Sequence, residues 1–494
     1  MSTGYAEHQP FVLYDSTQPT VEQDCACAAD AAPLALYSSA CAEGETDCAC
    51  AEAAVPVTFA ASPKGEALWK QAPGLYRAPL TREWEVFFNP ERPSGVVVVN
   101  RPAAAALETF HTPRPLADRT SQAMARAGLL TPASAPQDVV CPSETPGTLT
   151  AWLHVTNACN LQCAYCYVEK SAAAMTETTA RLAVDAVFRS ARDHGFRAVK
   201  LKYAGGEPTL NFAVVRALHR HAQSQAARAG LTLRETLLTN AADLTDDVLA
   251  FVAHSDIRLA VSLDLCSGAH DRQRPRQDGC ATYAQVRRNV ERAVRRGIAP
   301  HLSITITGTG DEQCADTVRF ALDMNLPFNL NFVRPVDEPI SDAQVSRIMR
   351  SVRMAFAEIE ARPPVHSLLA VLDRADLSRP HAYACGAGRA YLVVDPFGRI
   401  SPCQMTMTRP VGDIHMRDPL AAAQAAFANV PVWKRGACAG CTWRHACGGG
   451  CPLLARPAER GELGASPYCA AYRALCPELI RLEGLRLLNA HHHC

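Results

Sequence analysis

The chain carries one stretch that decides its fold, Thr156-Asn157-Ala158-Cys159-Asn160-Leu161-Gln162-Cys163-Ala164-Tyr165-Cys166-Tyr167. An apolar run at residues 152–156 leads into it and predicts a β-strand. Three thiolates at this CxxxCxxC spacing can hold three irons of a four-iron cubane and leave the fourth iron open for a ligand. Zinc normally takes four protein ligands, and this loop offers no local fourth. The spacing therefore favours an iron–sulfur site over the alternative, an isolated zinc site or a structural loop.

The sequence around this loop alternates between strands and helices from residue 151 to about residue 362. Strands are predicted at residues 152–156, 199–203, 233–239, 257–263, 302–307 and 328–333. Helices are predicted at residues 177–193, 212–228, 246–254, 283–296, 313–324 and 342–361. Six βα units predict a parallel sheet closed or half-closed into a barrel, with its ligand at the C-terminal ends of the strands. We therefore expect an α/β fold with a partial (β/α)6 barrel at residues 150–362.

Polar motifs follow successive predicted strands. Ala204-Gly205-Gly206-Glu207-Pro208 comes after the second strand, and its glycines allow the backbone to approach a ligand. Further along the strand ends lie Asn240, Ser262, Asp264 and Arg274. Asn240 or Ser262 alone would indicate only a strand-end cap, so the order of the motifs carries the interpretation.

With the cysteine loop, this order resembles the radical S-adenosylmethionine (SAM) superfamily over residues 150–335. The resemblance implies a [4Fe-4S] cluster on Cys159, Cys163 and Cys166. It also implies SAM contacts from Tyr165, Gly205, Gly206, Glu207, Asn240, Ser262, Asp264 and Arg274. Ala241 and Leu265 depart from the family pattern, which has Gly at these two places.

A second group of cysteines lies at residues 383–477. Its spacing is C-x12-G-x4-C, a gap, C-x2-C-x5-C-x3-C, a gap and C, whereas a zinc ribbon has two separated CxxC pairs. The pattern resembles the SPASM extension of radical SAM peptide maturases, which holds two auxiliary [4Fe-4S] clusters. The resemblance assigns Cys385, Cys403 and Cys451 to the first, and Cys438, Cys441, Cys447 and Cys469 to the second. The first cluster thus has three assigned cysteines, and its fourth iron would either be bound by Cys476 or stay open. Residues 478–494 are expected to form a C-terminal helix or tail.

The N-terminal part divides into two segments. Residues 1–63 hold nine acidic residues, no Lys or Arg, and the cysteines Cys25, Cys27, Cys41, Cys48 and Cys50. A near-repeat, Asp-Cys-Ala-Cys-Ala, begins at Asp24 and at Asp47. The segment is either a small metal site or an acidic disordered tail, and its low complexity favours the tail.

Residues 74–135 are predicted as an α+β unit with strands at residues 84–88 and 95–100 and helices at residues 102–110 and 116–127. This order resembles a winged-helix peptide-recognition domain. Such a domain would accept an extended peptide as an added strand, which we expect at the edge formed by residues 96–99.

Composition narrows the function further. Lys+Arg and Asp+Glu both number 49, so no basic excess points to a nucleic-acid or membrane-surface partner. No apolar run reaches the ~18 residues of a membrane span. The first Lys or Arg is Lys64, so we expect no export signal and a cytoplasmic location. Twenty-one cysteines in that setting indicate metal binding or redox chemistry rather than disulfides.

The resemblances together imply a radical SAM enzyme with three [4Fe-4S] clusters, SAM, and a reductant such as flavodoxin or ferredoxin. Its substrate would be a ribosomally made precursor peptide or a small protein. Hydrogen abstraction would lead to an oxidative cross-link, of which a thioether is the first choice, and we nominate no general acid or base. One alternative is a formylglycine-forming sulfatase-activating enzyme, but those enzymes have Asp where this chain has Gln404. The other is a non-enzymatic iron–sulfur or zinc protein.

Overall fold

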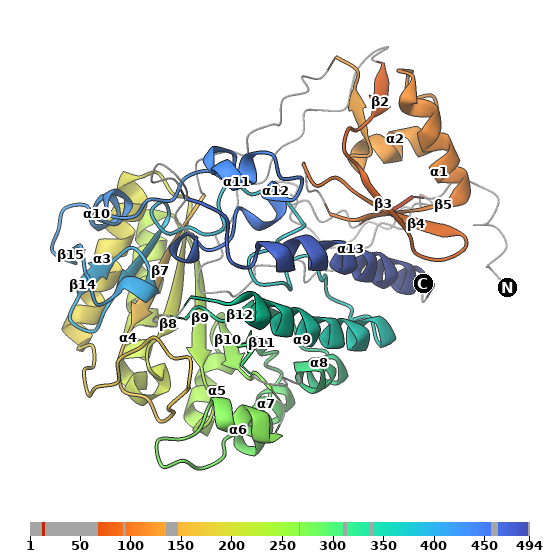
Figure 1. The fold of residues 1–494 in the computed structure, drawn as a ribbon. Coiled ribbons are helices and arrows are strands. Elements are labelled where there is room, and N and C mark those ends of the chain that lie inside the picture. The colour runs from red at the N-terminus through yellow and green to blue at the C-terminus, as the bar shows by residue number, and fades with distance from the viewer. Residues whose placement is uncertain are drawn as a thin grey trace.

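The computed structural model describes residues 12–14, 68–91, 95–134, 147–265, 267–309, 314–335, 339–455 and 463–492. A nine-stranded sheet forms the centre, in the order β12-β11-β10-β9-β8-β7-β13-β14-β15 (Figure 1). Its first six strands are parallel neighbours: β7 (Thr148–His154), β8 (Ala198–Ala204), β9 (Thr232–Thr239), β10 (Ile257–Ser262), β11 (His301–Ile306) and β12 (Phe328–Phe332). The predicted parallel-strand α/β fold is confirmed.

The helices between these strands cover the sheet. They are α3 (Glu177–Asp193), α4 (Phe212–Ala229), α5 (Asp246–Ala253), α6 (Ser267–Gln273), α7 (Tyr283–Arg295), α8 (Cys314–Asp323) and α9 (Asp342–Ala361), with a short η2 (Pro208–Asn211) before α4. Side-chain caps fix several starts, such as that of α3, where Thr176 accepts from the Thr179 amide. Gly230 ends α4 in the left-handed conformation, with φ +65°.

The sheet is larger than the predicted six strands. β13 (Tyr391–Val394) pairs parallel with β7, and β14 (Arg399–Ser401) and β15 (Gly412–Asp413) continue antiparallel. The apolar strand β13 therefore joins the C-terminal cysteine region to the edge of the barrel sheet next to β7. Sequence spacing alone did not reveal this junction.

Short helical turns and one long helix complete the C-terminal region. The turns are η3 (Gln404–Thr406), α10 (Pro419–Ala425), η4 (Val432–Lys434), α11 (Gly436–Ala439), α12 (Arg444–Cys447) and η5 (Pro452–Leu454). The long helix is α13 (Cys469–His492), which continues through Pro477, so the predicted boundary after residue 477 falls inside it. Figure 1 shows α13 between α9 and the N-terminal module, and it contacts both.

The N-terminal module contains a four-stranded antiparallel sheet in the order β1 (Val12–Tyr14), β5 (Val97–Asn100), β4 (Trp84–Phe88) and β3 (Tyr76–Pro79). α1 (Arg101–Glu108), η1 (Thr109–His111) and α2 (Arg119–Arg126) follow, and β2 (Trp69–Gln71) pairs with β6 (Leu130–Pro132). Trp443 stacks on Phe88 with ring centroids 6.1 Å apart, which fixes this module against the C-terminal cysteine region.

Two expectations for the N-terminal part are wrong. The edge at residues 96–99 is not free, because β5 lies between β4 and β1. Residues 12–14 are also not part of a disordered tail, since Val-Leu-Tyr is an apolar, strand-forming triplet inside an otherwise acidic segment. The five cysteines at residues 25–50, and the two interpretations given for them, lie outside the described residues.

No helix in the described ranges combines the length and apolarity needed to cross a bilayer.

Candidate functional site

A cavity of about 260 Å³ opens at the C-terminal ends of the barrel strands. Of the eleven residues predicted for the cluster and SAM there, all but Asp264 line it: Cys159, Cys163, Cys166, Tyr165, Gly205, Gly206, Glu207, Asn240, Ser262 and Arg274. Gln404 and Met405 line the same cavity, directly after Cys403 of the C-terminal region. One chamber thus joins the strand-end residues to the second cysteine region.

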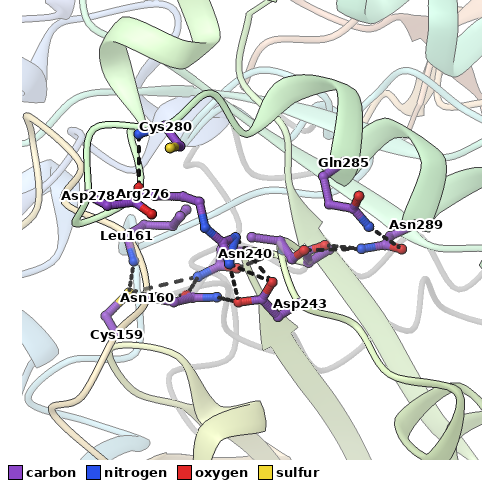
Figure 2. A network of polar contacts seen from close by, with 12 residues as sticks. Cys159, Asn160, Leu161, Asn240, Asp243, Arg276, Asp278, Cys280, Gln285 and Asn289 are labelled. Atoms are coloured by element: carbon purple, nitrogen blue, oxygen red, sulfur yellow. Dashed lines mark hydrogen bonds and ion pairs between the residues drawn. The ribbon is translucent and has the colours of Figure 1, made fainter.

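The barrel loop, residues 156–167, is held by its neighbours. Leu161 forms a β-bridge with Arg276, and the Gln162 amide donates to the Pro275 carbonyl at 2.8 Å. Asn160 donates to Asp243 at 2.6 Å and accepts from Asn240 at 2.8 Å. Figure 2 shows this network beside Cys159. Protein contacts alone therefore fix the loop conformation.

Donors surround the sulfurs of the barrel loop. The Leu161 amide lies 3.4 Å and the Asn240 side-chain nitrogen 3.8 Å from Cys159 Sγ. Lys170 Nζ lies 3.1 Å from Cys166 Sγ. Burial raises the pKa of both Cys159 and Cys163, so the neutral thiol is favoured there until a metal displaces the proton. The donors suit thiolate sulfurs, so the residues fit an iron–sulfur cluster.

No three His, Cys, Asp or Glu side chains in the described ranges are gathered tightly enough for a single metal ion. A cubane places its thiolates on separate irons and needs a wider set than one ion does. The spread of the three cysteines is therefore compatible with a cluster.

The two glycines of the Gly-Gly-Glu turn serve the barrel loop. A Cβ on Gly205 would lie 2.6 Å from the Thr156 carbonyl oxygen, and one on Gly206 would lie 2.4 Å from that of Ala158. The Gly206 amide donates to Thr156 O at 2.7 Å. Close backbone packing against the cysteine loop thus requires both glycines, a reason that differs from the predicted approach to a ligand.

Glu207 is 1% exposed and anchored by protein donors. Its Oε1 accepts from the Thr209 amide and hydroxyl and from the Thr239 hydroxyl, and its Oε2 accepts from the Asn240 amide at 2.8 Å. Burial raises the pKa of Glu207, and these hydrogen bonds oppose the rise. Oε2, with one such donor and two lone pairs, is the oxygen suited to a further cationic ligand.

Asp264 stands behind the cavity. It is fully buried, accepts from the Tyr165 hydroxyl at 2.6 Å and from Gln273 Nε2 at 2.8 Å, and lies 3.3 Å from Arg274 Nη1. Asp264 does not itself line the chamber, but it orients Tyr165 and Arg274, which do.

Three cations in the chamber were not predicted. Lys170 follows Cys166 by four residues, Arg334 follows β12, and Arg374 precedes the C-terminal region. Arg334 pairs with buried Asp373 at 2.8 Å. The rule that ligand-binding residues follow strands would have found Arg334, whereas nothing in the local sequence marks Arg374. With Arg274, these residues give the chamber four cationic side chains, against Glu207 as an acidic one.

The C-terminal cysteines influence one another's pKa values, while their division into two cluster-binding sets stays a prediction. Burial raises the pKa of Cys403 to about 12, and charge on Cys385 and Cys451 adds to the rise. Burial likewise raises the pKa of Cys447 to about 12, with contributions from Cys438, Cys441 and Cys469.

Cys476 is fully buried and belongs with the second set. Burial raises its pKa, and Cys447 and Cys441 are the cysteines whose charge adds to the rise. Whether Cys476 completes the set of Cys385, Cys403 and Cys451, or that set keeps an open iron, stays a prediction.

The sequence did not predict a buried arginine that lies near both groups of C-terminal cysteines. Arg435 is fully buried, and its Nη1 donates to the Gly449 carbonyl at 2.8 Å. Its Nε and Nη2 have no hydrogen-bond partner among the described residues. Burial lowers the pKa of Arg435, and four cysteines from both sets, Cys438, Cys385, Cys447 and Cys451, raise it. A guanidinium stays charged and requires a counter-anion when buried. The site therefore fits anionic iron–sulfur clusters on these cysteines.

Comparison with known proteins relates part of the chain to a protein family. Residues 153–321 match the Radical SAM superfamily. The antilisterial bacteriocin subtilosin biosynthesis protein AlbA of Bacillus subtilis (strain 168) is 24% identical over 278 residues, 53% of this chain and 56% of that protein. Uncharacterized protein MJ0907 of Methanocaldococcus jannaschii is 28% identical over 113 residues, 23% of this chain and 37% of that protein. The chain thus spans about a third to about half the length of these relatives.

A solved structure shares the fold. Native anSMEcpe with bound AdoMet superposes with a TM-score of 0.53 at 17% identity, over 70% of this chain and 99% of that one. The same protein has also been solved with AdoMet and the Cp18Cys peptide.

Proposed function

Residues 153–321 form a radical SAM domain, and from it we propose that the chain is a maturase that cross-links a cysteine-containing peptide or small protein through a thioether. Cys159, Cys163 and Cys166 hold the SAM cluster in this proposal. Cys385, Cys403 and Cys451 hold one auxiliary cluster, and Cys438, Cys441, Cys447 and Cys469 hold the other, in a SPASM-type region. The observation that carries the proposal is the single chamber lined by the barrel-loop cysteines and by Gln404 and Met405.

Each side of the chamber has a separate task. A cluster and SAM held by the barrel-loop residues would supply the radical chemistry needed to remove a hydrogen atom from an unactivated carbon. Glu207 Oε2 would receive the SAM ammonium and Asn240 and Ser262 would contact the rest of the cofactor, while Asp264 holds Tyr165 and Arg274 in place. Arg334 and Arg374 attract acidic groups of the substrate. The Cys403 side holds the substrate sulfur close to the carbon that loses hydrogen, so proximity supplies much of the selectivity.

The relatives support a peptide substrate. AlbA is by name a biosynthesis protein for the bacteriocin subtilosin, and anSMEcpe has been solved with AdoMet and the Cp18Cys peptide. The N-terminal module serves as the peptide-recognition domain in this proposal, although its β5 edge is already paired with β1. An external reductant such as flavodoxin or ferredoxin delivers the electron.

Formylglycine formation is disfavoured by the residue after Cys403. Gln404 is buried and accepts from the Tyr391 hydroxyl at 2.9 Å. A neutral amide in this position takes no proton from a substrate, unlike the Asp of sulfatase-activating enzymes.

Deoxyadenosine formation tests the proposal. The anaerobically reconstituted chain is incubated with SAM and dithionite, and deoxyadenosine is measured. We expect turnover by the wild type and only background from the triple variant Cys159→Ala, Cys163→Ala, Cys166→Ala. Cys280→Ala, at an exposed cysteine, is the matched control and should retain turnover. Background levels from the wild type would overturn the proposal.

A further inference from the structure

The turn that follows β9 contains a strained residue. Ala241 has φ +54°, in the left-handed region that is costly for any residue with a Cβ. It is buried, and it is one of the two positions at which the chain departs from the Gly of the family pattern. A residue keeps such a conformation only when the surrounding structure imposes it. The contacts around Ala241 must therefore hold the turn in place.

Asn289 of α7 supplies such contacts from outside the turn. Its Nδ2 donates to the Ala241 carbonyl at 2.7 Å and to the Ala242 carbonyl at 3.3 Å. Its Oδ1 accepts from Gln285 Nε2 at 3.3 Å and from Arg292 Nη1 at 2.6 Å. Because donors face Oδ1 and acceptors face Nδ2, the orientation of this amide is fixed by its neighbours. Asn289 is fully buried, so α7 presents a fixed pair of N–H donors to the turn.

Asn240, the residue before Ala241, contacts the site on the other side of the turn. Its backbone amide donates to Glu207 Oε2 at 2.8 Å. Its side-chain Nδ2 donates to Asn160 Oδ1 at 2.8 Å and lies 3.8 Å from Cys159 Sγ. Asn240 thus contacts both the carboxylate proposed for the SAM ammonium and a sulfur proposed for the cluster.

The donors of Asn289 and the contacts of Asn240 meet in this one turn, which Figure 2 shows beside the barrel loop. The conformation of Ala241 sets the direction of the peptide groups on both sides, so Asn240 moves with it. Alanine without outside support favours negative φ, and Asn240 would then turn away from the site. Glycine accepts positive φ at little steric cost, so at this position it would need no such support.

We propose that Asn289 is a positioning residue of the site at the barrel loop. It holds Ala241 in the left-handed conformation, and Asn240 is thereby aimed at Glu207 and at the Cys159 sulfur. The inference rests on the proposed function, because a cluster on that sulfur is what the Asn240 donor would serve. Hydrogen bonds to cluster sulfurs help to set the reduction potential, and a donor favours the more negatively charged reduced state. Loss of the Asn289 contacts should therefore lower the potential of the barrel cluster.

Hydrogen exchange of the full chain, before and after reconstitution, tests the turn itself. Asn289→Leu is close in size to the wild type but has no polar side-chain atom. We expect it to speed exchange in peptides covering residues 239–242 by about tenfold, because the amides of this turn donate to side chains whose positions depend on its conformation. Adding Ala241→Gly to Asn289→Leu should restore the exchange rate of the wild type. Equal exchange in Asn289→Leu and the wild type would overturn the proposal.

Redox titration of the reconstituted chain gives the second readout. Asn289→Leu should lower the potential of the barrel cluster by about 60 mV, which is a tenfold change in the reduction equilibrium of a one-electron couple. The double variant with Ala241→Gly should return to the potential of the wild type. Asn429→Ala is the matched control, because Asn429 Nδ2 likewise donates to two carbonyls, those of Cys385 and Ala387, at 3.0 and 2.8 Å in the C-terminal region. It should leave the potential of the barrel cluster unchanged.

The outcomes separate positioning from packing. Equal losses with and without Ala241→Gly would overturn the proposal, since Asn289 would then only fill space. Asn289→Ser is smaller and keeps one donor, so the same comparison in that variant decides if Asn289→Leu does not fold. A wild-type chain without a barrel cluster and without deoxyadenosine formation overturns the proposed function, whereas the exchange comparison still decides the role of Asn289 in the turn.

Discussion

The barrel loop at residues 156–167 and the cysteine ladder at residues 438–451 present cysteines in different frameworks. The loop follows a buried seven-residue strand and is cross-linked by hydrogen bonds to the chain around Arg276. In the ladder, Cys438 lies on α11 and Cys447 on α12, helices of four residues each, and the other two cysteines lie outside them. Such short turns contribute little stability of their own. The difference teaches that protein contacts shape the loop, whereas the ladder has little structure of its own and, under the proposed function, would depend on its clusters.

Replacing cysteines of the ladder is expected to have the largest effect and so tests this comparison most strongly. We expect Cys438→Ala with Cys447→Ala to speed amide exchange across residues 432–454 by more than about a hundredfold, because metal–ligand bonds supply folding free energy where other structure is scarce. The triple variant of the barrel loop should leave exchange in β7 and β8 unchanged. Hydrogen exchange with mass spectrometry measures both, and equal protection losses in the two regions would refute the comparison.

The next effect concerns the backbone contact under the barrel loop. Gly206→Ala would place a Cβ 2.4 Å from the Ala158 carbonyl oxygen. The loop must then shift, and we expect about a hundredfold slower deoxyadenosine formation, as displacements near 1 Å produce. Gly230→Ala is the matched control, because nothing lies within 4 Å of its added Cβ. It should cost about 1 kcal/mol of stability and no activity. Equal rates for the two variants would show that the close contact is unimportant.

Arg435 tests the electrostatics of the ladder. Removing a buried cation beside a cluster disfavours the extra electron, so Arg435→Gln should lower the auxiliary-cluster potentials by about 60 mV, one decade for a one-electron couple. Arg435→Lys should recover part of the shift. Lys170→Gln, at a half-buried cation beside the barrel loop, should leave the auxiliary potentials unchanged. Redox titration followed by electron paramagnetic resonance measures these potentials. Unchanged auxiliary-cluster potentials in Arg435→Gln would contradict the proposed role of Arg435.

The smallest effect is a pH dependence in the barrel. Burial lowers the pKa of His270 to about 4, and neither ring nitrogen has a partner in the described part of the chain. The unfolded state takes up the proton near pH 6.5, so stability is present above that pH and is lost as the pH falls toward 4. We expect a loss of up to about 1.4 kcal/mol per pH unit from His270, reduced in His270→Gln. Urea unfolding at pH 6.5, 5.5 and 4.5 measures it, and identical slopes would exclude this contribution.

The sequence predicted the barrel well because local signals agreed. α3 has its predicted bounds, Glu177–Asp193, since Thr176 supplies a helix cap at the expected place. The strand-end motifs converge on one cavity because parallel strands bring their C-terminal ends together. The features that the sequence did not predict depend on long-range contacts. They are the pairing of β13 with β7 and that of β1 with β5, which join residues far apart in sequence.

Within the site, residue type predicted which residues belong to the site better than it predicted what each of them does there. Asp264 bonds Tyr165 and Arg274 from behind the chamber, and Gly206 packs closely against the Ala158 carbonyl. Arg435 carries no local signal, because burial of an arginine between cysteines from two parts of the chain is visible only in three dimensions. The spacing of cysteines in the sequence therefore identifies a set of cysteines, whereas the packing of the folded chain identifies Arg435 as the residue that balances their charge.

The central claim is that one chamber lies between a SAM cluster and auxiliary clusters held by separate cysteine sets. Iron and sulfide analysis of the anaerobically reconstituted chain tests it most directly. Three cubanes predict about twelve irons in the wild type and about eight in the triple variant of Cys159, Cys163 and Cys166. About four irons in the wild type, with none in the triple variant, would contradict the auxiliary clusters.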